Sequence, residues 1–133
     1  MKREPKWVEK RALLLLHEES LAEFGGSRGL RDEGLLESAL DRARNKYHYD
    51  RRGCTIAVLA AAYGFAMARN HPFVDGNKRA AFLSIGVFLA MNGYELRADQ
   101  VEAITMIEEL AAGRIDEAAL AEWIGARSVK ARV

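Results

Sequence analysis

The sequence has little cysteine, proline or net charge, and each shortage narrows the class of protein. Its one cysteine, Cys54, excludes an internal disulfide framework and any zinc or iron–sulfur site built from several cysteines. Two prolines and no low-complexity stretch argue against long disordered segments. Twenty Lys and Arg stand against nineteen Asp and Glu, so the formal net charge is +1. This balance gives no support to direct DNA binding by the chain.

Long apolar runs are also missing. The two longest uncharged stretches, residues 53–68 and 80–94, hold 16 and 15 residues. A helix that crosses a bilayer needs about 20 apolar residues. The run Leu13–Leu16 is far too short for the hydrophobic region of a signal peptide. We therefore expect a cytoplasmic protein with no membrane partner, in which the two uncharged stretches form helices buried on most sides.

What is present suffices for one core, because the 133 residues are 50% apolar and 29% charged. Apolar residues recur with helical spacing almost throughout, and little period-two alternation suggests strands. We expect one all-α domain over residues 1–133, a compact helical bundle of about six helices. The expected helices cover residues 7–24, 35–44, 56–70, 77–92 and 99–113, with a last one from residue 116. An exposed connection, RARNKYHYDRRG, should end at Gly53, and residues 94–97 should be extended.

Local signals indicate where the helices begin and end. Pro72 cannot continue the helix before it and pushes His71 out of helical conformation, so a short loop should separate the two central helices. The helix after this loop should begin at Asn77. Four residues that can cap a helix N-terminus stand at expected helix starts: Asp32, Thr55, Asp99 and Asp116.

The loop between the central helices, HPFVDGNKR at residues 71–79, gathers several chemically capable groups. The helix beginning at Asn77 presents unpaired N–H groups and the positive end of its dipole. Gly76 has no Cβ, so a ligand can approach the backbone closely. Lys78 and Arg79 add two cations, which would oppose the dipole unless an anion bound there. These residues together predict a phosphate-binding turn.

Two further groups in this loop suggest a reaction. Asp75 can offer a hard oxygen ligand to Mg²⁺ beside a polyphosphate. His71 is the candidate general base, because a neutral imidazole can take the proton of an attacking hydroxyl. The pattern predicts transfer of a phosphate-containing group from a nucleotide. It does not have the glycine and lysine spacing of a Walker motif.

The nine residues resemble the active-site motif of the Fic/Doc family in its death-on-curing (Doc) form, and the resemblance extends over roughly residues 13–125. It implies an all-α fold and a toxin of a toxin–antitoxin pair. It also implies a kinase that uses ATP and Mg²⁺ to phosphorylate a threonine of elongation factor Tu, which blocks translation. The motif residues match a catalytic base, a buried aromatic anchor, a Mg²⁺-linked acid and a phosphate-binding turn with two catalytic cations: His71, Phe73, Asp75, Gly76, Asn77, Lys78 and Arg79.

Two positions separate the chain from the adenylyl-transferring branch of that family. Lys78 stands where that branch usually has glycine, and Phe82 stands where it has a second arginine. Ala80 departs from the Doc pattern, in which threonine is frequent. The self-inhibitory pattern of the adenylyl transferases is not found. Restraint would therefore come from another chain, and we expect an antitoxin that folds as a helix into an apolar groove.

Alternatives remain beside this interpretation. The chain could move AMP to a protein hydroxyl, or it could be a non-catalytic module that binds an antitoxin. Outside the motif, His17 on the polar side of its helix and His48 in the connection are interpreted as structural or solvated. The basic cluster within residues 42–52 is a solvated face or a contact for substrate or antitoxin. Cys54 should be a small buried hydrophobe, and apolar side chains of the fourth helix should form core: Phe82, Ile85, Phe88 and Leu89.

Overall fold

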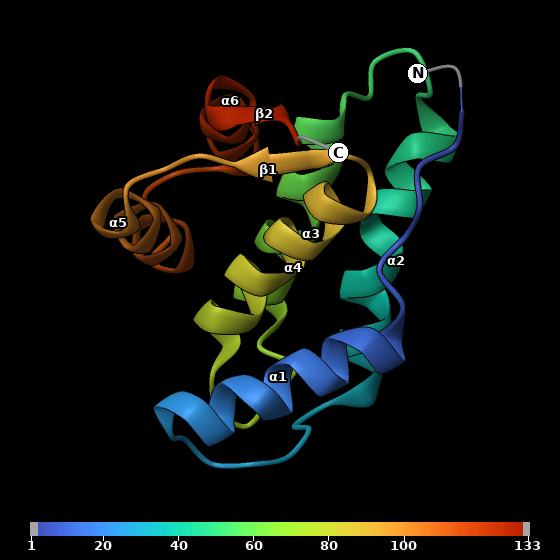
Figure 1. The fold of residues 1–133 in the computed structure, drawn as a ribbon. Helices are drawn as coiled ribbons and strands as arrows, with labels where there is room; N and C mark the ends of the chain where they lie inside the picture. The colour runs from blue at the N-terminus through green and yellow to red at the C-terminus, as the bar shows by residue number, and fades with distance from the viewer. Residues whose placement is uncertain (1–2, 132–133) are drawn as a thin grey trace.

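The computed structural model describes residues 3–131 and confirms an all-α architecture with six helices over that range. Figure 1 shows α3 and α4 side by side in the middle, with α1 lying across one end of this pair. A short antiparallel ribbon, β1 with β2, lies at the opposite end. The elements are α1 (Lys10–Phe24), α2 (Glu33–Tyr49), α3 (Ile56–Asn70), α4 (Asn77–Met91), β1 (Tyr94–Leu96), α5 (Gln100–Ala111), α6 (Glu117–Arg127) and β2 (Ser128–Lys130).

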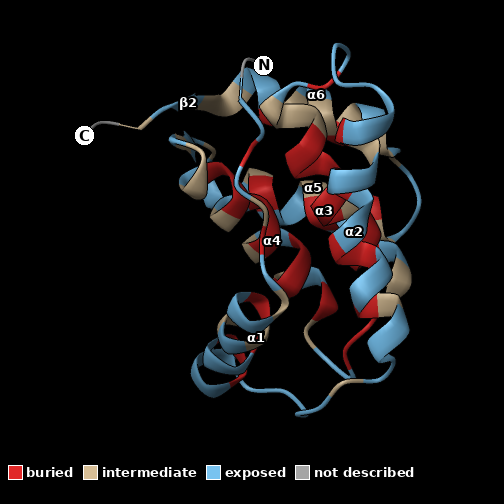
Figure 2. Ribbon diagram, turned by 90° about the vertical axis from the view of Figure 1, so that its right-hand side faces the viewer, coloured by how far each residue is buried: buried red, intermediate tan, exposed pale blue. Residues whose placement is uncertain are grey.

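Helix α3 is the centre of the core, because it packs against α2, α4 and α6. Its alanines let the neighbouring helices approach closely, and residues 59–64 are buried on every side (Figure 2). Gly64 marks the closest approach, since a Cβ there would lie 2.5 Å from Cδ1 of Ile85 on α4. The two expected central helices are therefore α3 and α4. The loop that joins them begins and ends on helices that are packed in the core.

The second helix is longer than the sequence suggested. Most of the expected connection is helical, because α2 continues to Tyr49. The reason is burial: Tyr47 extends the apolar stripe of Leu40 and Ala43, and only 2% of it is exposed. Its ring meets that of Trp7 edge-on, with 5.6 Å between the centroids. His48 accordingly lies on a helix and not in a loop, although it is exposed.

The first helix begins later than expected, at Lys10. Residues 7–9 are used differently: the backbone N–H of Val8 donates to the buried hydroxyl of Tyr63 at 3.0 Å, and Trp7 stacks on Phe88. At the other end of the chain, the extended piece at residues 94–97 is confirmed as β1, but its partner β2 was not expected. A strand of three residues carries too little alternation to be recognised without its neighbour.

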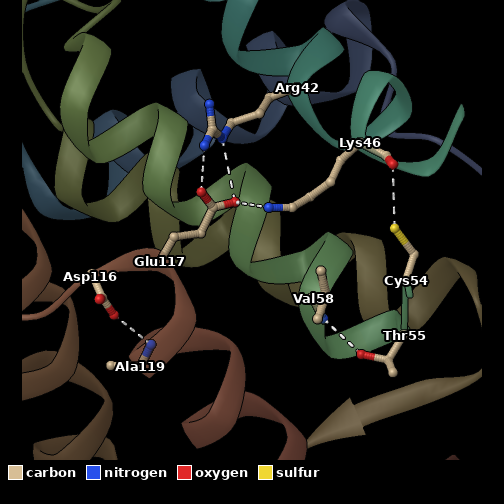
Figure 3. A network of polar contacts seen from close by, with 8 residues as sticks. All are labelled: Arg42, Lys46, Cys54, Thr55, Val58, Asp116, Glu117 and Ala119. Atoms are coloured by element: carbon tan, nitrogen blue, oxygen red, sulfur yellow. Dashed lines mark hydrogen bonds and ion pairs between the residues drawn. The ribbon is translucent and has the colours of Figure 1, made fainter. Parts of the chain in front are cut away.

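The four expected N-caps are confirmed, each accepting a backbone N–H of its own helix: Asp32 from Leu35, Thr55 from Val58, Asp99 from Val101 and Asp116 from Ala119. Figure 3 shows two of these caps beside an ion-pair network that joins α2 to α6. There Glu117 accepts from Arg42 at 2.5 Å and lies 3.4 Å from the amine of Lys46. Cys54 is buried, as expected.

Arg42 and Lys46 belong to the basic cluster within residues 42–52, and two other members of that cluster lie over aromatic rings. Arg44 lies over the ring of Trp7, and Arg51 over that of Tyr47. Within residues 3–131, none of the helices combines the length and the apolar character that a membrane crossing requires.

Candidate active site

The connection between α3 and α4 has an unusual backbone at both ends. His71 ends α3 in the left-handed region, with φ 48° and ψ 57°, and it is the one non-glycine residue with positive φ in the described part of the chain. Such a conformation costs about 1–2 kcal/mol for a residue with a Cβ. At the other end, Gly76 precedes α4 with φ 77°, a value that glycine adopts without strain.

The side chain of Asn77 holds this connection together from inside. Its Oδ1 accepts the backbone N–H of Phe73, and its Nδ2 donates to the carbonyl of the same residue, both at 2.9 Å. Nδ2 also lies 3.5 Å from Nδ1 of His71. Asn77 is only 8% exposed. Its amide is thus committed to the loop, and its contribution to an anion site is its backbone N–H in the first turn of α4.

Asp75 links the loop to the glycine-rich segment that follows α1. Its carboxylate accepts the N–H of Ser27 at 3.0 Å and the N–H of Gly76 at 2.8 Å. These two bonds lower the pKa of Asp75, with Arg79 and His17 adding smaller effects in the same direction. The group is exposed and therefore ionised at neutral pH, while the segment 25–29 lies directly against it.

Helix α1 supports the loop through His17, whose expected place on the polar side of that helix is wrong. His17 is 4% exposed, and its ring stacks on that of Phe73 with centroids 3.6 Å apart. Its Nε2 lies 2.8 Å from the carbonyl oxygen of Asp75. Because that oxygen can only accept, Nε2 carries the proton. The signal was available: His17 lies four residues after Leu13 and four before Leu21, both buried.

The two cations of the motif lie differently. Lys78 is exposed at the start of α4. Arg79 turns back toward α1, where its guanidinium lies 4.6 Å from the ring centroid of Phe24 and 3.3 Å from Oγ of Ser20. One turn beyond Lys78, Phe82 is 39% exposed, so its assignment to the core is wrong. The other core residues expected on α4 are confirmed as buried: Ile85, Phe88 and Leu89.

The segment of residues 27–32, of which only Asp32 was expected to have a role, runs along the loop. Leu30 pairs with Phe73 in an isolated antiparallel bridge, and Val74 N–H donates to the carbonyl of Gly29 at 3.0 Å. Arg31 donates through its guanidinium to the carbonyls at the end of α3. No local pattern marks these contacts, because they join positions about 40 residues apart.

Comparison with known proteins shows the family of this chain. A sequence model described as the Fic/DOC family matches residues 7–89. The chain belongs to this family. "Protein kinase doc" of Escherichia phage P1 is 30% identical over 117 residues, which are 88% of this chain and 91% of that protein. "Toxin Doc" of Mycolicibacterium smegmatis is 41% identical over 76 residues, 57% of this chain and 58% of that protein.

The active loop of this Fic/DOC chain brings all the motif residues into the turn before α4 or its first turn. The basic residues within 42–52 are not among them. A magnesium ion would fit beside the exposed, ionised carboxylate of Asp75 only together with bound phosphates, because the helix N-terminus next to it favours anions. Groups of three or more His, Cys, Asp or Glu that could hold a metal are absent from the described residues. One carboxylate together with nucleotide phosphates is the arrangement that Mg²⁺ prefers.

A groove of about 600 Å³ lies behind the loop, between α1 and the segment 28–30. Its floor is apolar and includes Leu14, Leu21 and Leu30, and the stacked pair His17 and Phe73 forms part of its wall. The rim carries Lys10, Arg11, Arg28 and Glu18; Lys10 pairs with Glu33 and Glu37, and Arg28 pairs with Glu18. The groove therefore touches the two rings that support the active loop.

Proposed function

We propose that this chain is the toxin of a toxin–antitoxin pair and acts as a protein kinase. It transfers the γ-phosphoryl group of ATP to a threonine of elongation factor Tu and so blocks translation. The observation that carries the proposal is the loop 71–79, in which a base, an ionised carboxylate and a cationic helix N-terminus converge. The names of both relatives, a protein kinase and a toxin, support it.

The chemistry follows from the position of each group. The threonine hydroxyl attacks the γ-phosphorus while the bond from that phosphorus to the β–γ bridging oxygen breaks, and ADP leaves. Neutral His71 accepts the hydroxyl proton. The N–H groups at the start of α4, with Lys78 and Arg79, bind the phosphate oxygens. A Mg²⁺ ion held by Asp75 would neutralise charge on the phosphates.

Phosphoryl transfer is favoured over transfer of AMP by two side chains of α4. Lys78 places a long cation at the first turn, and Phe82, one turn later on the same side of the helix, is 39% exposed. A phenylalanine cannot bind phosphate oxygens as an arginine would. A nucleotide whose phosphates are not bound by an arginine at position 82 should lie with its γ-phosphate toward His71.

The decisive experiment is to incubate the protein with ATP, Mg²⁺ and elongation factor Tu and to weigh the intact product. We expect one added phosphoryl group and release of ADP. His71→Ala should lower the rate by about 10²–10⁴ while leaving the fold intact, since the side chain is exposed. A product heavier by AMP, with pyrophosphate released, would place the chain with the adenylyl transferases. No transfer at all would favour a binding module.

The groove beside α1 is where we propose that the antitoxin binds. Its apolar floor fits the apolar face of an amphipathic helix. Acidic side chains along that helix would pair with Arg11 or exchange with the present partners of Lys10 and Arg28. An occupant there would press on His17 and Phe73 and so reach the active loop. Leu15 lines the groove and is 53% exposed, so Leu15→Glu should fold, retain kinase activity and escape the antitoxin in co-expression. Val101→Glu, at a more exposed position on α5, should remain restrained.

A further inference from the structure

The end of α3 leaves backbone carbonyls that the helix itself cannot satisfy. The last carbonyls of any helix have no intrahelical partner. Here the chain leaves the helix at His71 and enters Pro72, which has no N–H to offer. The carbonyl groups of Asn70, His71 and Pro72 therefore need donors from elsewhere in the fold.

Two consecutive residues, Arg31 and Asp32, supply donors to all three carbonyls. The Nε of Arg31 donates to the carbonyl of His71 at 2.6 Å, and its Nη2 donates to that of Asn70 at 2.7 Å. The backbone N–H groups of Arg31 and Asp32 both donate to Pro72, at 2.7 and 3.1 Å. The planar guanidinium thus spans two successive carbonyls, and its positive charge stands at the negative end of the α3 dipole.

These hydrogen bonds from Arg31 and Asp32 matter because His71 has a left-handed backbone conformation. The exposed imidazole has one polar contact, 3.5 Å from its Nδ1 to Nδ2 of Asn77, and the path of the backbone at His71 decides whether the ring can make it. We propose that Arg31 is a positioning residue, which holds the backbone of His71 so that the imidazole faces the start of α4. The catalytic consequence rests on the proposed function, in which His71 is the base. The geometric part stands on the contacts alone.

A spectroscopic experiment tests the geometric part directly. The chain has three histidines, so the ring signals in ¹H–¹³C spectra can be assigned with single variants. In Arg31→Ala the His71 ring signal should shift and broaden, while those of His17 and His48 stay in place. In Arg31→Lys the His71 signal should change less, because a lysine can reach one carbonyl but not both. Arg97→Ala, an exposed arginine paired with Glu95, should leave all three unchanged.

The kinase assay tests the catalytic part. Arg31→Ala should lower kcat by about 10- to 100-fold, the loss expected from a misplaced group, with little change in KM for ATP. In a His71→Ala background the same change should cost nothing further, because Arg31 acts only through that side chain. An unchanged His71 signal, or equal shifts of His17 and His71, would overturn the proposal. If the wild-type protein transfers no phosphoryl group, the proposed function fails while the spectra still decide the role of Arg31.

Discussion

Replacing Asn77 by alanine should destabilise the protein more than replacing any exposed side chain of the motif. Both polar atoms of its amide are bonded to the backbone of Phe73 at 2.9 Å, in a place where little solvent reaches. A hydrogen bond contributes about 0.5–1.5 kcal/mol, but a buried partner left unsatisfied costs about 1–3 kcal/mol. Two such partners remain in Asn77→Ala. The better helix propensity of alanine offsets only about 0.7 kcal/mol of this loss.

The expected loss in the free energy of unfolding is therefore about 2–4 kcal/mol. For a domain of this size it lowers Tm by about 6–20 °C, which thermal unfolding followed by circular dichroism resolves easily. Total stabilities are about 5–15 kcal/mol, so the variant should still fold at room temperature. Asn45→Ala, at an exposed position of α2, is the matched control and should change the free energy of unfolding by less than about 0.5 kcal/mol.

A second variant, Asn77→Asp, separates the two bonds. It keeps an acceptor for the N–H of Phe73 but sets a carboxylate against the carbonyl of the same residue. Its deficit should shrink as the pH falls toward about 4, because the buried carboxyl protonates first in the folded protein and can then donate to that carbonyl. If Asn77→Ala unfolded at the wild-type temperature, the amide would not hold the loop, and this account of its geometry would be refuted.

Three other predictions follow from single contacts. Gly64→Ala should destabilise the protein by about 1–3 kcal/mol, because the added Cβ would meet the side chain of Ile85. Gly86→Ala, in open space on α4, should stabilise it by about 0.5–1 kcal/mol. If chemical denaturation showed Gly64→Ala to be the more stable of the two variants, the packing of α3 on α4 would be contradicted. His17→Phe keeps a ring against the loop but loses the donor to Asp75, so its Tm should lie between those of wild type and His17→Ala; equal values for both variants would exclude a role for the stacked rings. The pKa of Asp75 is lowered in the folded protein, so its contribution to stability is present above about pH 4 and lost as the pH falls through the lowered value. The difference in Tm between wild type and Asp75→Asn should therefore be largest near neutral pH and should disappear in acid. A difference that grew in acid would show that the pKa of Asp75 is raised in the folded protein.

Most of the fold could be predicted from local pattern. Helix caps are local devices, and each of the four expected caps acts within three residues of its own position. The predictions that were wrong concern contacts between residues far apart in the sequence. The second helix continues through a polar stretch because Tyr47 meets Trp7, 40 residues earlier. The pairing of β1 with β2 joins residues more than 30 positions apart.

The candidate site divides in the same way. Its proposed chemistry is local, because the motif carries the candidate base, the carboxylate and the cations within nine residues. Its support comes from α1 and from the segment 27–32, which lie about 40 to 60 positions earlier in the chain. His17 could have been assigned to the buried face of its helix by spacing. Arg31 could not, since a loop arginine gives no sign of which carbonyls it will reach.

This division has a physical consequence for how the site works. A left-handed His71 costs about 1–2 kcal/mol. Within the nine-residue loop, Asn77 offsets part of this cost by bonding both backbone groups of Phe73. Further support comes from outside, through Arg31 at the end of α3 and His17 beneath Asp75. The geometry of the candidate site therefore depends on the packing of α1 and the segment 27–32 against the loop. A partner that binds the groove between those two elements acts on the supports of the site and need not touch the reacting atoms.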